Sequence, residues 1–425
     1  MKRRLYPGSI SYLLTASMFI LGTAIALFTH NPVENIMKNY SYDVLVILIA
    51  MELFTDLIAE TGIMQYLAVK ITGFSQGRKR ICLIMFGILM FLISSCLNNI
   101  TAVMMILPVI FVLLKAIEPD RKYVYIFFGV ILALSNTGGA ASPIGDFPAI
   151  VIMTSGITSF TGYLFHAFPL FALTSVILLA VWEIYAKKDA DDGSLRRLAV
   201  SNLKSQYRNI RIRWDVLSLL TLVFIGMIAA WSLVPQTLLP PEVIAILGYA
   251  AAMSVCVIKK IKPCQTMDLK SVLMIASFLF FAEVVSQTGI LNLVADWMQS
   301  HITDPRLLVM AIMIITSLVA GVFSAGPAAA AMMPVIIELC NGPLGAWSDW
   351  IAVSYAAAIC AGSSLFMWSA TAGFILSDKV TGAGIEVEDG KKVVWGVGQY
   401  FKYGIVNYLV QISIALAAAM LVLSI

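Results

Sequence analysis

The most informative part of this chain runs from Ser135 to Pro148 and reads SNTGGAASPIGDFP. Two adjacent glycines and two prolines oppose a regular helix over this stretch, whereas apolar half-helices are expected on both sides, at 123–134 and 149–158. The stretch also holds Asp146, the only Asp, Glu, Lys or Arg in the apolar segment 123–158. These features predict a discontinuous helix that carries a buried carboxylate.

The composition of the whole chain places this segment in a membrane. The 425 residues are 60% hydrophobic and only 12% charged, with a mean hydropathy of +0.91. Soluble domains contain roughly 45–50% apolar and about 25% charged residues. Apolar runs of membrane-spanning length recur along the chain, which predicts an all-α polytopic membrane protein. The predicted core also lacks a His/Glu metal set or a Ser–His pair, so we do not expect an enzyme.

The distribution of basic residues predicts the topology. Short cytoplasmic loops of membrane proteins collect Lys and Arg. Basic clusters occur at residues 2–4, 78–80, 121–122, 187–213, 259–262 and 391–392. By contrast, the loops at 233–241 and 341–349 contain neither Lys nor Arg. This pattern predicts a multi-pass protein of the bacterial inner (cytoplasmic) membrane with a cytoplasmic N-terminus.

A consistent path through the membrane requires two segments that turn back without crossing. Basic residues flank residues 81–115 on both sides, so this segment is predicted to enter and leave from the cytoplasm. Residues 306–340 are predicted to enter and leave from the opposite face. The resulting N-terminal half covers residues 1–186 and contains hairpin 81–115 and broken helix 123–158. A basic cytoplasmic loop follows at 187–213. The C-terminal half covers residues 214–425 and contains hairpin 306–340 and broken helix 350–377.

A weak internal echo supports two inverted repeats, each with a re-entrant hairpin and a discontinuous transmembrane helix. Asp56 followed by Thr61-Gly62-Ile63 matches Glu283 followed by Thr288-Gly289-Ile290 in type and spacing. Hairpins that enter from opposite faces are the arrangement expected of inverted-topology repeats. Asp56 and Glu283 are also candidates for proton or ion coupling, because ionisable groups within membrane segments are functional by default.

The broken segments are the predicted binding site. Irregular backbone at membrane depth is tolerated only where it is buried in protein or lines a wet cavity. Its free carbonyls can coordinate cations, and its free amide ends can bind anions. The alternative explanations of these segments are a purely structural kink and interhelical hydrogen bonding without a binding role. The candidates in the first half are Asn98, Asn99, Thr101, Ser135, Asn136, Thr137, Gly138, Gly139, Ser142 and Asp146.

The second half offers a less polar set of candidates. It has hydroxyls and glycines at the corresponding places but no carboxylate, and close helix packing through small residues is the alternative explanation. These candidates are Ser324, Gly326, Ser363, Ser364, Ser369 and Thr371.

These motifs resemble those of a known family. The sequence GGAxSPIGD at 138–146 resembles the broken-helix motif of the ion transporter superfamily, which includes arsenite permeases, NhaD-type sodium–proton antiporters, citrate transporters and divalent-anion:sodium symporters. The sequence LNNIT at 97–101 resembles the hairpin-tip motif of the same group. The tip departs from the Asp-Asn usual in antiporters, and divalent-anion symporters tend to have Thr at the place of Asp146.

The resemblance implies ion-coupled transport by an elevator movement, commonly in a homodimer. It also implies that Asn98, Asn99, Thr101, Asn136, Thr137, Gly138, Ser142 and Asp146 line the first ion or substrate site, with Na+ as a candidate ligand of Asn98, Gly138 and Asp146.

We therefore expect a secondary active transporter of a small anion, such as a carboxylate or an inorganic oxyanion, coupled to Na+ or H+. The alternative is a Na+/H+ antiporter, which needs only a titratable buried carboxylate. The expected partners are the small ion or anion, the lipid bilayer and a second copy of the chain, and neither nucleic acid nor a cofactor other than Na+ is expected. Substrate identity, coupling ion, stoichiometry and direction stay open at this point.

Overall fold

The computed structural model describes residues 7–30, 33–117, 119–186, 200–201, 205, 212–261, 269–342, 345–387 and 390–422. Within these ranges the regular elements are helices, apart from an isolated antiparallel bridge between Glu386 and Lys392. The predicted all-α membrane fold is confirmed. The basic residues 2–4 and most of the loop 187–213 lie outside the described residues.

Six of the described helices are long and apolar enough to cross a membrane. They are α7 (Arg121–Ala140), α9 (Phe160–Tyr185), α11 (Trp214–Leu233), α12 (Pro241–Ile258), α15 (Pro305–Phe323) and α19 (Val397–Val422). In α7, 94% of the apolar window is buried inside the protein, against 22% in α11. The helix that leads into the predicted break is therefore central, whereas α11 exposes most of its surface for lipid.

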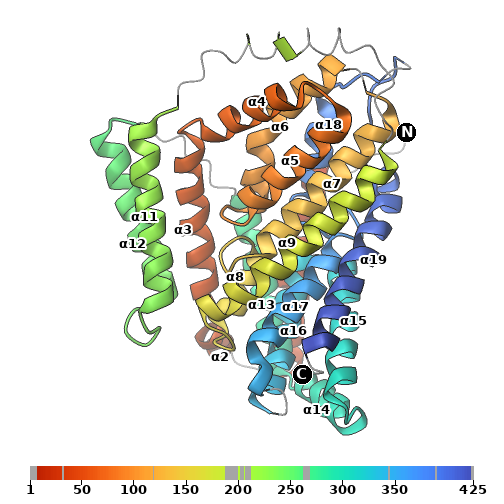
Figure 1. Ribbon diagram of the computed structural model, residues 1–425. Coiled ribbons are helices and arrows are strands. Elements are labelled where there is room, and N and C mark those ends of the chain that lie inside the picture. Colours follow the sequence, from red (N-terminus) through yellow and green to blue (C-terminus); the bar gives the residue numbers. More distant parts are fainter. Residues whose placement is uncertain are drawn as a thin grey trace.

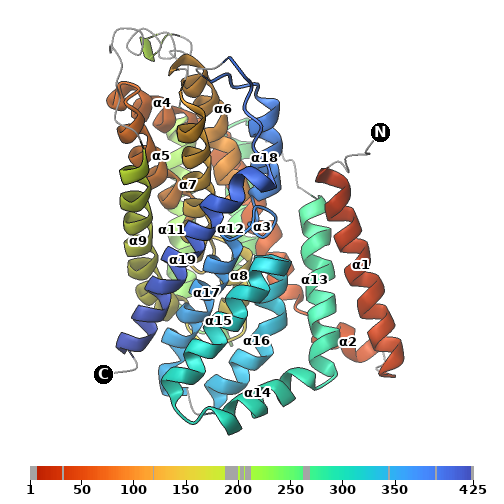
Figure 2. The same cartoon turned by 90° about the vertical axis from the view of Figure 1, so that its right-hand side faces the viewer.

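Two helix pairs form the outer parts of the molecule. Helix α1 (Pro7–Phe28) packs against α13 (Leu269–Gln287), and Figure 2 shows this pair at one edge. Helix α3 (Tyr42–Ala59) packs against α12, with α11 beyond it (Figure 1). Each pair thus joins an element of one half to an element of the other. A short helix, α2 (Val33–Asn39), connects α1 to α3.

Two helical hairpins enter the centre from opposite ends (Figure 2). The first consists of α5 (Lys79–Ser94) and α6 (Asn99–Ile117), joined by a four-residue turn at 95–98. The second consists of α15 and α16 (Ala325–Asn341), joined at Ser324, whose φ of +98° is unusual for a residue other than glycine. These two pairs occupy the segments 81–115 and 306–340 for which hairpins were predicted.

Both discontinuous helices are present, although the first break is shorter than predicted. Helix α7 continues to Ala140, and α8 (Phe147–Thr154) begins after six non-helical residues. The prediction that Gly138 and Gly139 interrupt the helix is therefore wrong. Glycine costs a helix only about 1 kcal/mol relative to alanine, and here it allows close packing, since a Cβ on Gly138 would lie 2.5 Å from the Phe91 carbonyl oxygen.

The second discontinuous helix is built in the same way. Helix α17 (Ser348–Ser363) ends at a non-helical stretch, and α18 (Gly373–Gly382) follows it. The glycine near the end of α17, Gly362, is packed as tightly as Gly138, because a Cβ there would collide with the Ser317 carbonyl oxygen of the second hairpin. In each half, the broken helix thus presses a glycine against the backbone of its hairpin.

The two Thr-Gly-Ile echoes form the same turn. Gly62 and Gly289 have φ values of +77° and +74°, and the preceding threonine hydroxyl donates to a carbonyl three residues back at 2.6 Å in both cases. Each turn leads into a helix that was not predicted, α4 (Ile63–Ser75) or α14 (Ile290–His301). Figure 2 shows these helices at opposite ends of the molecule. The inverted-repeat relation stays a prediction, and these paired turns support it.

Candidate functional site

Asp146 lies at the meeting point of three elements. It is the N-cap residue of α8, where its Oδ1 atom accepts from the Phe147 amide at 2.8 Å. Its Oδ2 atom accepts from Asn99 Nδ2 at the start of α6, at 2.7 Å, and from the Thr371 hydroxyl at 3.4 Å. The side chain is 7% exposed, and all three of these donors are neutral. The carboxylate thus connects the first hairpin, the first break and the second break without a counter-charge from these groups.

The amide of Asn99 is oriented toward Asp146 by a second contact. The Ser94 hydroxyl, on the last residue of α5, donates to Asn99 Oδ1, which leaves the NH2 group to face the carboxylate. Ser94 Oγ also lies 2.8 Å from the Ser135 carbonyl oxygen. A Cβ on Gly139 would collide with Asn99 Oδ1, so glycine is required for this approach. We call Ser94, Asn99 and Asp146 the polar triad.

A second polar group joins the two broken helices beside the triad. Asn136 Nδ2 on α7 lies 3.3 Å from both the Ser363 and Ser364 hydroxyl oxygens at the end of α17. Gln411 Oε1 on α19 accepts from Ser364 Oγ at 3.4 Å and from Cys360 Sγ at 3.3 Å. All five side chains are buried. The predicted residues Asn136, Ser363 and Ser364 therefore come together, whereas Gln411 was not predicted.

Two tyrosines that were also not predicted cap the broken helices. Tyr163 donates its hydroxyl to the carbonyl of Ala140, the last residue of α7, at 2.8 Å. Tyr400 donates to the carbonyl of Ser364, just after α17, at 2.7 Å. Each tyrosine is the fourth residue of a 26-residue helix, α9 or α19. Two carbonyls expected to be open to a cation are thus occupied by tyrosine hydroxyls, and the shared position in the helix is the signal that could have revealed them.

The hairpin tips are tied to the breaks in both halves. Ser142 donates to the Ser95 carbonyl at 2.5 Å, and Ser324 donates to the Ser369 carbonyl at 3.1 Å. Gly326 faces α8, since a Cβ there would lie 3.2 Å from the Phe147 ring. Each tip is therefore fixed to the break of its own half, and the second hairpin also contacts the short helix that Asp146 caps.

The other predicted residues lie near this centre but contact different groups. Asn98 Oδ1 accepts from the Ile100 amide at 2.9 Å and so caps α6. Thr101 is half-buried in the first turn of α6. Thr137 Oγ1 lies 2.9 Å from Ser175 Oγ on α9. The Gly138 carbonyl, a predicted Na+ ligand, accepts from the Ala141 amide at 2.9 Å.

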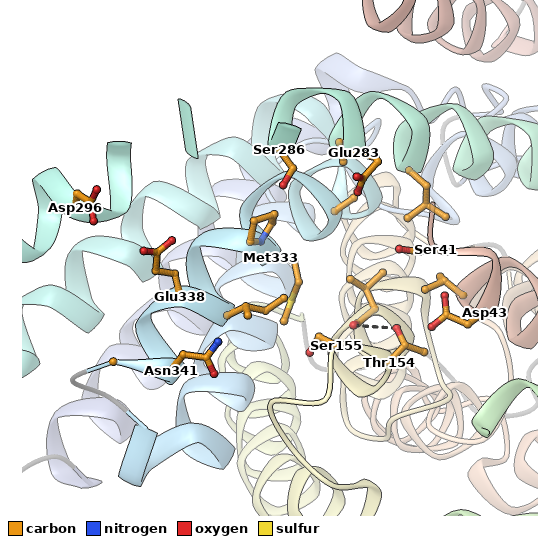
Figure 3. A pocket seen from close by; sticks show the side chains of 18 residues that line it. Ser41, Asp43, Thr154, Ser155, Glu283, Ser286, Asp296, Met333, Glu338 and Asn341 are labelled. Atoms are coloured by element: carbon orange, nitrogen blue, oxygen red, sulfur yellow. Dashed lines mark hydrogen bonds between the residues drawn. The ribbon is translucent and has the colours of Figure 1, made fainter. Parts of the chain in front are cut away.

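The candidate coupling residue Glu283 lies in a different place. A cavity of about 700 Å³ lies between the start of α3, the end of α8, and helices α13, α14 and α16. Figure 3 shows Glu283 and Asp43 on one side of it and Asp296 and Glu338 on the other. Glu283 Oε1 accepts from Gln287 Nε2 at 2.8 Å. Asp146 is not among the residues that line this cavity, and neither is Asp56, which is half-buried near the end of α3.

Comparison with known proteins identifies relatives along most of the chain. A family model described as "Citrate transporter" matches residues 9–360. A 46 kDa membrane protein of Mycobacterium leprae is 24% identical over 303 residues, which cover 70% of this chain and 68% of that protein. The magnetosome protein MamN of Paramagnetospirillum magneticum is 23% identical over 399 residues, which cover 90% of this chain and 88% of MamN.

The fold is similar to that of a solved transporter. The crystal structure of the YdaH transporter of Alcanivorax borkumensis, described as having an unusual topology, aligns with 98% of both chains at a TM-score of 0.52 and 13% sequence identity. The resemblance to citrate transporters noted from the sequence is confirmed by the family match.

Proposed function

The chain belongs to the citrate transporter family, and we propose that it is a secondary active transporter of a small carboxylate coupled to Na+ or H+. The observation that carries this proposal is the buried carboxylate of Asp146 at the junction of a hairpin and two broken helices. An ionised group at this depth is costly. A cation that binds there neutralises it, so loading of the cation changes the energy of the whole junction.

The contacts of Asp146 explain how cation loading can be coupled to movement. Its Oδ2 atom already accepts from Asn99 and Thr371. A proton or Na+ at this oxygen competes with both donors and weakens the link between the first hairpin and the second break. The hairpins and broken helices are tied to one another by serine hydroxyls that donate to backbone carbonyls and by closely packed glycines. We propose that they move as one body against α1, α3, α12 and α13 in an elevator movement.

The proposed cargo is a carboxylate because of the family and of the polar groups beside the triad. Asn136, Ser363 and Ser364 supply amide and hydroxyl groups without a fixed charge. Such groups can donate hydrogen bonds to a carboxylate once the cation has neutralised Asp146. A homodimer is proposed as the assembly, and light scattering of the purified protein tests it.

Uptake of radiolabelled citrate into proteoliposomes tests the proposal. We expect an inward Na+ gradient or an inward H+ gradient to accelerate uptake, and Asp146→Asn to abolish the dependence on that gradient. Asp349→Asn is the matched control, because Asp349 is a half-buried carboxylate that accepts from Thr158 at 2.6 Å and lies outside the triad. Gradient-dependent uptake that survives in Asp146→Asn would refute the assignment of the cation site.

An assay without citrate distinguishes Na+/H+ antiport from carboxylate symport. The triad is a carboxylate with neutral donors, which is sufficient for exchange of Na+ and H+. A pH-sensitive dye inside the vesicles then reports proton movement driven by a Na+ gradient when citrate is absent. Proton movement under these conditions would establish antiport and overturn carboxylate symport.

A further inference from the structure

The hairpins and the second segments of the broken helices correspond at a constant spacing in the two halves. In three pairs the helix starts are 226 positions apart: α5 at Lys79 and α15 at Pro305, α6 at Asn99 and α16 at Ala325, and α8 at Phe147 and α18 at Gly373. The prolines inside α6 and α16, Pro108 and Pro334, have the same spacing. The spacing also relates the two carbonyls that meet the tight glycines, those of Phe91 and Ser317. Corresponding residues can therefore be read off directly.

This correspondence assigns an alanine to each member of the polar triad. The residues 226 positions after Ser94, Asn99 and Asp146 are Ala320, Ala325 and Ala372. Ala325 is the first residue of α16, as Asn99 is of α6, and Ala372 is the N-cap residue of α18, as Asp146 is of α8. Ala320 lies three residues before the end of α15, but it faces Gly362 as Ser94 faces Gly138, since a Cβ on either glycine would lie 2.8 Å from the Cβ of its neighbour. Asp146 accepts from the first amide of α8, whereas Ala372 makes no side-chain cap.

The space around the three alanines is filled by packing. Their exposed fractions are 0%, 2% and 0% for Ala320, Ala325 and Ala372. The Ala325 amide donates to the Ser369 carbonyl at 3.2 Å, and a Cβ on Gly362 would lie 2.8 Å from the Ala320 Cβ. The second half thus keeps the backbone arrangement of the first, but it has no side-chain oxygen at these places to hold a cation.

We infer that the second half contains the backbone counterpart of the Asp146 site without its three polar side chains, so that each protomer binds a single monovalent cation, in the first half only. The inference rests on the proposed function, because it assumes that Asp146 is the cation site. Thr371 of the second break completes the surviving site by donating to Asp146 across the two halves. One cation per protomer then accompanies each transport cycle.

The test counts cations bound by the full-length purified protein. Equilibrium dialysis against radioactive Na+ at saturation is expected to give one Na+ per protomer. If protons are the coupling ion, no Na+ binds, and the dependence of citrate uptake on proton concentration is expected to have a Hill coefficient of 1. Two bound Na+ ions, or a Hill coefficient close to 2, would overturn the inference while leaving the proposed function intact.

A triple variant gives an independent test with a built-in control for folding. The variant is Ser94→Ala/Asn99→Ala/Asp146→Ala, which gives the first half the same three alanines that the second half has at the corresponding places. Gel filtration checks that this variant folds. We expect the bound cation to fall from one to none. One cation retained by the folded variant would show that the second half has a site of its own. If the unaltered protein shows neither Na+ binding nor cation-dependent uptake, the proposed function itself fails, together with the inference.

Discussion

At the tip of the first hairpin, Asn99 extends a side-chain amide to the carboxylate of Asp146 at 2.7 Å. At the same place in the second hairpin, Ala325 offers only its backbone amide, which donates to the Ser369 carbonyl at 3.2 Å. Both tips meet a broken helix, and both are held by a glycine that allows close contact. The two tips thus share a backbone arrangement, and they differ in the three polar side chains of the triad, which are alanines at the corresponding places in the second half.

Substitutions of the two asparagines at the first tip test this difference between the halves most directly. Asn99→Ala removes a hydrogen bond to the ionised carboxylate, which is worth about 1.5–3 kcal/mol and competes with the cation, so we expect the cation concentration for half-maximal citrate uptake to fall roughly 10- to 100-fold. The neighbouring variant Asn98→Ala is the control, because Asn98 caps α6 and does not hydrogen-bond to Asp146. A rise in that concentration for Asn99→Ala, or equal shifts in both variants, would contradict the assignment of Asn99 as the competing donor.

The tight glycines test whether the two halves share their packing. Gly138→Ala and Gly362→Ala each force a Cβ against a hairpin carbonyl, and overpacking of this kind costs about 1–3 kcal/mol. We expect both variants to lower the thermal unfolding temperature of the purified protein by similar amounts, measured by tryptophan fluorescence. Gly226→Ala in α11 is the control, since a Cβ there meets nothing within 4 Å. A loss confined to the first half would show that the packing is not shared.

The tyrosine caps extend the comparison to the ends of the broken helices. Tyr163→Phe and Tyr400→Phe each leave one carbonyl without its donor, at a cost of about 1 kcal/mol for an interhelical hydrogen bond in a membrane. We expect nearly equal decreases in unfolding temperature for the two variants. Tyr42→Phe serves as the control because Tyr42 is 48% exposed. A much larger effect on cation affinity than on stability would show that the tyrosines belong to the binding site.

The smallest expected effect concerns the contact that crosses between the halves. Thr371→Val removes the longest of the three hydrogen bonds to Asp146, at 3.4 Å, which also competes with the cation, and we expect roughly a two- to threefold stronger cation affinity. The same citrate uptake assay measures it. A weaker cation affinity in this variant would mean that Thr371 holds the cation directly and that the second half contributes more than a supporting contact.

The positions of the hairpins and of both broken helices could be predicted from sequence because lipid restricts the backbone so strongly. A lone carboxylate among apolar residues, flanked by Gly and Pro, has few explanations in a membrane, and Asp146 indeed lies at the centre of the cluster. The path of residues 81–115, which are predicted from the flanking basic residues to enter and leave from the cytoplasm, stays a prediction.

The contacts that sequence could not reveal depend on tertiary structure. Gly138 and Gly139 were expected to break the helix, but they are helical, and their lack of a Cβ allows a neighbouring hairpin to approach. The helices α4 and α14 are short and lie outside the predicted crossings. Gln411 carries no local signal, since its partner Cys360 lies 51 residues away along the chain.

The tyrosine caps also have a consequence for how the protein is assembled. The carbonyl at the end of α7 receives its donor from α9, and the carbonyl after α17 receives its donor from α19. In both cases the cap belongs to the helix made after the broken one. During synthesis, therefore, the tyrosine donor of each broken helix becomes available only after the next long helix has been made, which is α9 for the first half and α19 for the second.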